Sequence, residues 1–183
     1  YRVIVASNNP IICFMIEVLA SSPSEIEFQA AIAEIGSVRR GKERLETHLK
    51  SLYVTDCRNC SEYVHVDYFL WRRDHDKPFA RYYHCTQCGD EGEYPISPGD
   101  IERLSIPGSD QLHRARAMQR CKLEQDELQR GVEEALNTYL SRPLYFLFNL
   151  INKLESLTIS DRTRQLLTAL IISVCDAGNT LWP

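Results

Sequence analysis

Two Cys-x-x-Cys pairs constrain the fold of this chain more than any other feature. The first pair is Cys57 and Cys60, and the second is Cys85 and Cys88. Two thiolates separated by two residues can approach one ion from a tight turn, and a second such turn completes a tetrahedral site. Disulfides and a redox pair are the alternatives, but no secretory pattern and no βαβ unit accompany the cysteines. Because four ligands leave no open position, the spacing predicts a structural zinc ion.

The residues between the pairs have the pattern of a β-ribbon. Residues 63–72 can run outward as a strand, "RDHDKP" can turn, and residues 79–84 can return. A two-stranded ribbon is marginally stable alone, whereas structural zinc binds small peptides with about 10–16 kcal/mol. Zinc would therefore fix this ribbon. Gly89 follows the second pair and frees the backbone there, while Ser61 stands at the matching position after the first pair.

Most of the remaining chain shows helical spacing of its apolar residues. Residues 11–19 are apolar nearly all round, which predicts a deeply buried helix. Cys13, Cys121 and Cys175 fall in helical patterns and are predicted to be buried. Further helices are expected after an N-cap at Ser24, around 45–52, from Ser97-Pro98, over 111–122 and 125–140, from Pro143, and over 161–177.

Charge and hydropathy exclude several classes of protein. The net charge of -4 argues against nucleic-acid binding through the overall field, so that only a local basic patch could serve. No apolar run is long enough for a membrane span, and the N-terminus has no secretory pattern. We therefore expect a soluble, cytoplasmic protein with no membrane partner. The missing initiator Met and the abrupt end after "NTLWP" suggest a piece of a longer protein.

The ribbon mixes aromatic residues with arginines, which is the combination that stacks bases and contacts phosphate. Acidic residues between them cancel most of that charge, which favours core filling and docking onto the helices over nucleic-acid contact. A second basic segment, "HRARAMQRCK", places His113, Arg116 and Arg120 on one helical face, for which a solvated surface is the favoured interpretation and nucleic-acid contact the alternative. The candidate nucleic-acid contacts are Arg72, Arg73, Arg81, Arg116 and Arg120.

The chain shows no catalytic motif of its own. It has no Gly-rich phosphate loop, no nucleophile elbow and no HExxH sequence. The opening "RVIVASNNP" predicts a strand over residues 3–6 that passes into a helix. In such a junction Asn8 or Asn9 can cap the helix, with Pro10 in its first turn.

The motifs and their order along the chain resemble those of bacterial DNA methylases, which are class I S-adenosylmethionine-dependent amino-methyltransferases. "VASNNP" is similar to the G-V-D-x-N-P end of their second strand. "LYVTDCRNC", "VDYFLWRRD" and "RYYHCTQCGDEGEYP" resemble the zinc ribbon that several of them insert. "SRPLYFLFNLINKL" and "DAGNTLW" are similar to helical segments that follow. The resemblance covers almost the whole chain, and its most specific part is the ribbon.

The resemblance implies a mainly α fold with a small zinc β-ribbon, led by a strand and helix from a Rossmann-like cofactor domain. The implied parts are the edge strand and helix of that domain over residues 1–22, a helical connector over 23–52, the ribbon over 53–97 and a helical region over 98–183. The family's Gly-rich loop and P-P-Y turn do not occur in this segment. We therefore expect the segment alone to be inactive.

For the whole enzyme, the resemblance implies methyl transfer from S-adenosylmethionine to an exocyclic base nitrogen, as in restriction-modification systems. Its partners would be DNA and the remainder of the methyltransferase chain. Ser7 and Asn9 are the candidate cofactor contacts, although the family usually carries an acidic residue at the position of Ser7 to bind the ribose. The alternative is a non-catalytic zinc-ribbon module that binds protein or nucleic acid.

Overall fold

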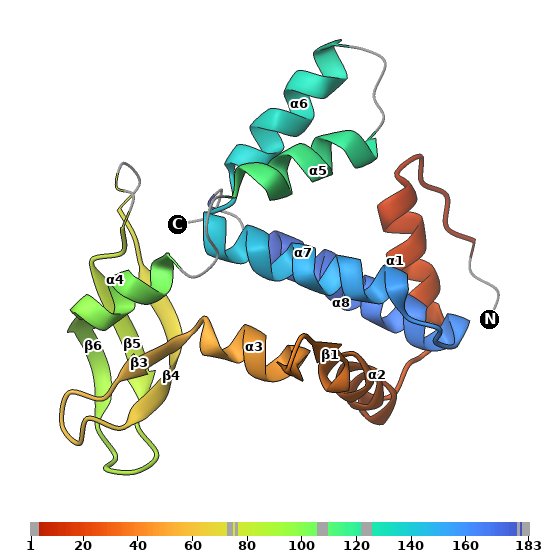
Figure 1. Ribbon diagram of the computed structural model, residues 1–183. Helices are drawn as coiled ribbons and strands as arrows, with labels where there is room; N and C mark the ends of the chain where they lie inside the picture. Colours follow the sequence, from red (N-terminus) through yellow and green to blue (C-terminus); the bar gives the residue numbers. More distant parts are fainter. Residues whose placement is uncertain are drawn as a thin grey trace. The chain divides into compact units, whose positions relative to one another are not determined.

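The described residues of this computed structural model combine helices with antiparallel strands (Figure 1). They divide into two compact units, of which unit 1 comprises Tyr1–Val38 and Leu123–Pro183 and unit 2 comprises Arg39–Lys122. The fold is thus mixed, with a larger sheet than the predicted ribbon. The four-part division predicted from the sequence stays a prediction. The structure describes residues 4–72, 75, 77–105, 110–121, 126–178 and 180.

Unit 1 is built from five described helices. Helix α8 contacts α1, α2 and α7, so that it is the central element of the unit. The buried side chains Leu144 and Leu147 of α7 and Leu166 and Leu167 of α8 form much of its core, as their helical spacing predicted. The helices are α1 (Pro10–Ala20), α2 (Glu25–Ser37), α6 (Asp126–Asn137), α7 (Ser141–Ser156) and α8 (Asp161–Ala177).

Local capping explains where α2 begins. The Ser24 side chain accepts a hydrogen bond from the Glu27 N–H, and the Glu27 carboxylate accepts one from the Ser24 N–H at 2.8 Å. This reciprocal capping box satisfies two helix donors and confirms the predicted N-cap. Glu27 also accepts a hydrogen bond from Arg162 Nε of α8 at 2.9 Å, which ties the start of α2 to the start of α8.

Two predictions for the opening segment are wrong. Residues 4–7 form neither helix nor strand, and Ile4 is 95% exposed, because no described strand pairs with this segment. Helix α1 is largely exposed rather than deeply buried, since it contacts its unit mainly through α8 and buries only Val18. Its apolar residues Ile11 and Leu19 remain 53% and 67% exposed.

Unit 2 holds a four-stranded antiparallel sheet of order β3-β4-β5-β6 (Figure 1). The predicted outward and returning strands are β4 (Tyr63–Leu70) and β5 (Ala80–His84), and both are confirmed. The flanking β3 (Val54–Asp56) and β6 (Glu91–Pro95) were not predicted. The unit also contains the two-residue strands β1 (Arg39–Arg40) and β2 (Glu43–Arg44), and helices α3 (Leu45–Ser51), α4 (Pro98–Leu104) and α5 (Gln111–Cys121).

Helix α4 is fastened to the sheet by buried charges. Asp100 is fully buried and pairs with Arg81 of β5, whose Nη2 donates to the Asp56 carbonyl at 3.1 Å. Arg103 of the same helix donates to the Asp56 carboxylate at 3.3 Å. Burial opposes the ionisation of Asp100, but hydrogen bonds and the Arg81 charge outweigh it, so the pKa of Asp100 lies below its usual range. These contacts fix α4 against β3 and β5.

Candidate metal centre

The four predicted cysteines converge on one point. Their Sγ atoms all lie within 4.8 Å of one another. Cys57 Sγ is 3.6 Å from Cys88 Sγ, and Cys60 Sγ is 3.7 Å from Cys85 Sγ. Zn–S bonds of about 2.3 Å in a tetrahedron require sulfur atoms roughly 3.8 Å apart. The four thiols can therefore hold a metal ion such as zinc.

The same backbone turn presents each pair. In the first turn the Cys57 N–H donates to the Glu62 carbonyl, and the Ser61 N–H donates to the Cys57 carbonyl. In the second, Cys85 and Gly89 make the equivalent two bonds. Ser61 and Gly89 both adopt left-handed conformations, with φ of 62° and 73°. Serine thus fills the position where the second turn uses glycine, which is why the departure noted in the sequence leaves the turn intact.

Two of the four cysteines are part of the ribbon's own core. Cys57 and Cys85 are buried, whereas Cys60 and Cys88 are exposed. The buried pair forms a cluster with Val64 and Tyr83. A cluster this small offers little apolar burial, so a metal ion bound by the cysteines would add to the stability of this end of the sheet.

The thiols differ in acidity. A hydrogen bond from the Asp90 N–H, followed by one from Asn59, lowers the pKa of Cys88 to about 7. For Cys60, a backbone hydrogen bond at Glu62 favours the thiolate, but burial and the other thiols raise the pKa to about 12. Four adjacent thiols do not all ionise without a cation to neutralise them. Metal binding would therefore release protons from this site.

The structure places the predicted nucleic-acid contacts on different elements. Arg72 is exposed, and its Cζ lies 5.1 Å from the Phe79 ring centroid. Arg116 and Arg120 are exposed on α5. Arg81 is only 5% exposed and pairs with Asp100, so it is not available to phosphate and its prediction is corrected. Arg73 lies outside the described residues.

The predicted cofactor contacts lie at the start of α1. Asn9 caps this helix, since its Oδ1 accepts hydrogen bonds from the Ile11 and Ile12 N–H groups. Ser7 Oγ accepts a hydrogen bond from the Asn9 N–H at 3.1 Å. Capping accounts for both side chains, and their cofactor role stays a prediction. Cys13 and Cys121 are exposed and Cys175 is partly buried, so the predicted burial is wrong for the first two.

The polar residues beside the thiols were not predicted from the sequence. Tyr83 Oη donates to Asp90, and Tyr94 Oη donates to the other oxygen of the same carboxylate. The hydrogen bond from Tyr94, followed by the one from Tyr83, lowers the pKa of Asp90. The Tyr83 hydroxyl has a raised pKa, chiefly through burial. The nearest signal in the sequence was Asp90 directly after Cys88-Gly89, flanked by tyrosines on neighbouring strands.

One face of the sheet is open and acidic. Tyr68 and Tyr82 stack there with ring centroids 4.9 Å apart, and the strand register places Glu93 opposite Tyr82. Glu91 accepts hydrogen bonds from Tyr82 and His84, and its bond to Tyr82 is the main cause of a Tyr82 pKa raised to about 12. The period of two along β5 and β6 was the available signal for this face.

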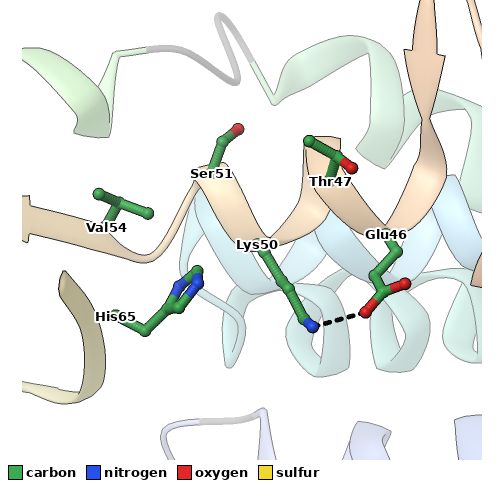
Figure 2. Close-up of a pocket in the computed structure, with 6 residues that line it drawn as sticks. All are labelled: Glu46, Thr47, Lys50, Ser51, Val54 and His65. Carbon is green, nitrogen blue, oxygen red and sulfur yellow. Dashed lines mark hydrogen bonds and ion pairs between the residues drawn. The ribbon is translucent and has the colours of Figure 1, made fainter. Parts of the chain in front are cut away.

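A separate hollow lies beside α3 and the sheet (Figure 2). Lys50 Nζ is 2.5 Å from Glu46 Oε1 there, and the Ser51 hydroxyl donates to the His48 carbonyl at 2.7 Å. Among the described contacts, none joins Ser51 to His65. Its lining residues are Glu46, Thr47, Lys50, Ser51, Val54 and His65.

No family model, curated protein or solved structure matches the chain. The methylase resemblance stays a prediction carried by the motifs themselves. No described helix is both long and apolar enough to cross a membrane.

Proposed function

We propose that this chain is the zinc-ribbon and helical region of an S-adenosylmethionine-dependent DNA methyltransferase, where it positions or recognises DNA for methylation of an exocyclic base amine. The observation that carries the proposal is the convergence of Cys57, Cys60, Cys85 and Cys88 within 4.8 Å. Four thiolates satisfy a tetrahedral zinc ion completely, so the ion is structural and leaves the chemistry to another site. The methylase motifs around these cysteines supply the functional context.

In this proposal, DNA meets the end of the ribbon rather than its open sheet face. The open face carries the carboxylates of Asp67, Glu91 and Glu93, which repel phosphate. The turn between β4 and β5 instead presents the exposed cations Arg72 and Lys77. Arg72 lies over the Phe79 ring, so an aromatic surface adjoins the charge, as in proteins that stack and neutralise single strands.

Fluorescence anisotropy with a labelled DNA duplex tests the DNA contact. The zinc-loaded chain should bind with an affinity that falls steeply with salt, because phosphate contacts release counterions. Replacing Arg72 and Lys77 together by Ala should reduce the salt slope by about two. Lys50→Ala is the matched control, because Lys50 is an exposed cation paired with Glu46. Absence of binding by the zinc-loaded chain, or equal slopes for both variants, would refute the DNA contact.

A second test addresses the enzyme. The coding sequence around this segment should contain a D-P-F-x-G-x-G-type loop and a P-P-Y-type turn if the proposal holds. Their absence would favour a non-catalytic zinc-ribbon module.

One observation favours that second function in a protein-binding form. The open face combines the stacked Tyr68 and Tyr82 with the carboxylates of Glu91 and Glu93. Tyrosine rings and carboxylates together bind arginine and lysine side chains. An octa-arginine peptide should then bind the zinc-loaded chain, and Glu91→Gln with Glu93→Gln should weaken it. Equal binding by the variant would argue against this face.

A further inference from the structure

The Tyr83 hydroxyl lies between the two cysteine turns. It accepts a hydrogen bond from the Arg58 N–H at 2.8 Å, and Arg58 belongs to the first turn, between Cys57 and Cys60. It donates to Asp90 Oδ2 at 2.8 Å, and Asp90 follows the second turn directly. Tyr83 itself is fully buried. One hydroxyl group thereby connects the backbone of one turn to the residue that closes the other.

Asp90 is held from several directions. Its backbone carbonyl accepts the Cys85 N–H at 2.7 Å, and its Oδ1 accepts the Tyr94 hydroxyl at 2.7 Å. Its Oδ2 lies 3.6 Å from Cys57 Sγ. The carboxylate thus contacts a thiol of the first turn while its backbone closes the second turn. The position of Asp90 is set by both halves of the site.

The tyrosine rings restrict how this network can move. Tyr83 and Tyr94 stack with centroids 5.1 Å apart, and the Arg58 guanidinium lies 5.7 Å from the centre of the Tyr94 ring. Aromatic stacking of this kind fixes ring orientation, and here it directs both hydroxyls at one carboxylate. Groups that orient ligands without touching the ion commonly change metal affinity by 10–100-fold.

We propose that Tyr83 and Asp90 are positioning residues that hold the two cysteine turns at the spacing a single metal ion requires. This inference rests on the metal-binding part of the proposed function. If Tyr83 acted through packing alone, Tyr83→Phe should leave the zinc affinity unchanged, because this substitution keeps the buried ring and removes only the bridging oxygen.

Zinc affinity of the 183-residue chain, measured by competition with a chromophoric chelator, tests the inference. Tyr83→Phe and Asp90→Asn should each weaken zinc binding at least tenfold. The double variant should lose little more zinc affinity than the weaker-binding single variant loses, because both changes break the same bridge. Tyr82→Phe is the matched control: it is the neighbouring tyrosine, its hydroxyl donates to Glu91, and its affinity should stay within twofold of the parent chain.

Cobalt absorption separates positioning from loss of a ligand. All variants should retain the intense bands of a four-thiolate cobalt site, because every cysteine is still present. Affinities for Tyr83→Phe and Asp90→Asn within twofold of the parent would overturn the inference and leave the metal site standing. Failure of the parent chain to bind zinc would instead refute the proposed function. If Asp90→Asn does not fold, as judged by circular dichroism with zinc present, Tyr83→Phe alone decides the question.

Discussion

The sheet of unit 2 and the helices of unit 1 are stabilised by different means. In unit 1, side chains such as Leu147 of α7 and Leu166 of α8 are buried together, so that apolar area removed from water supplies the stability. The sheet's buried cluster around the thiols contains only four residues, and Cys57 and Cys85 are two of them. Hydrogen bonds and charged groups lie around that cluster, among them Asp90 and Arg81.

This contrast shows how the thiol end of a small sheet can have a defined structure with a small apolar cluster. A hydrocarbon core tolerates volume-conserving changes, because it depends on total packing. A site of four thiols, a tyrosine bridge and a buried ion pair depends on individual atoms. The sheet should therefore be sensitive to chemistry, and the helices should be sensitive to volume.

Removal of metal should have the largest effect and should separate the two regions. Chelation, or replacement of Cys57 and Cys60 by Ser, removes binding energy on the order of 10 kcal/mol, comparable to the whole stability of a domain. Hydrogen exchange should then lose protection in β4 and β5 while α7 and α8 stay protected. Equal loss in both regions would show that the helices also depend on the ion.

Loss of the buried ion pair should come next. Asp100→Ala leaves the Arg81 charge buried without its partner, which should cost about 3–5 kcal/mol. The effect should appear as faster hydrogen exchange in β3 and β5 of the zinc-loaded chain. Glu102→Ala removes an exposed carboxylate from the same helix and should change stability by no more than about 0.5 kcal/mol. Similar costs for the two variants would contradict the role given to the pair.

A cavity in unit 1 tests the other side of the comparison. Leu166→Ala should destabilise the helices by about 2–5 kcal/mol, because Leu166 is almost fully buried. Thermal unfolding followed by helical circular dichroism measures this loss, and zinc affinity should not change. Leu128→Ala on α6 is the control, since Leu128 is 52% exposed. A parallel fall in zinc affinity would show that the two regions are coupled.

Loss of the Glu27 charge in acid should have the smallest of these effects, and it concerns unit 1. The Ser24 N–H, followed by Arg162, lowers the pKa of Glu27 from 4.5 to about 2. A lowered carboxyl pKa gives stability that is present above about pH 4.5 and is lost as the pH falls towards 2. Melting temperatures between pH 5 and pH 2.5 should therefore decline less for Glu27→Gln than for the parent chain. Glu34→Gln changes an exposed site on α2, and its melting temperature should decline as much as that of the parent chain.

The parts of the structure that the sequence predicts correctly are those with local causes. Cysteine spacing predicts the convergence of the thiols, the Ser24 cap predicts the start of α2, and the spacing of Leu144 and Leu147 predicts the buried face of α7. Each of these signals is a short local pattern, although the thiols of the two cysteine pairs then meet across 25 and 31 positions. Strands β4 and β5 were also predicted correctly, because the cysteine pairs mark where the ribbon begins and ends.

The parts that were missed depend on distant partners. Arginine is usually a surface residue, so the sequence around Arg81 does not predict its burial. Its buried partner Asp100 lies on α4, 19 positions further along the chain. The apolar sequence of α1 predicted deep burial, but α1 buries only Val18. The buried area of a helix depends on which other elements pack against it. Tyr83 and Asp90 meet only because the turn after Cys88 brings β6 back beside β5.

Strand β6 was missed for a reason that has a consequence of its own. Its sequence "EGEYP" has low β-propensity, with two glutamates, a glycine and a proline. It is also an outer strand of the sheet, where unpaired backbone groups can recruit a strand from another molecule. Glu91 and Glu93 place charge along that edge, and Pro95 offers no N–H. The composition that conceals the strand from prediction thus protects the ribbon from edge-to-edge aggregation at high concentration.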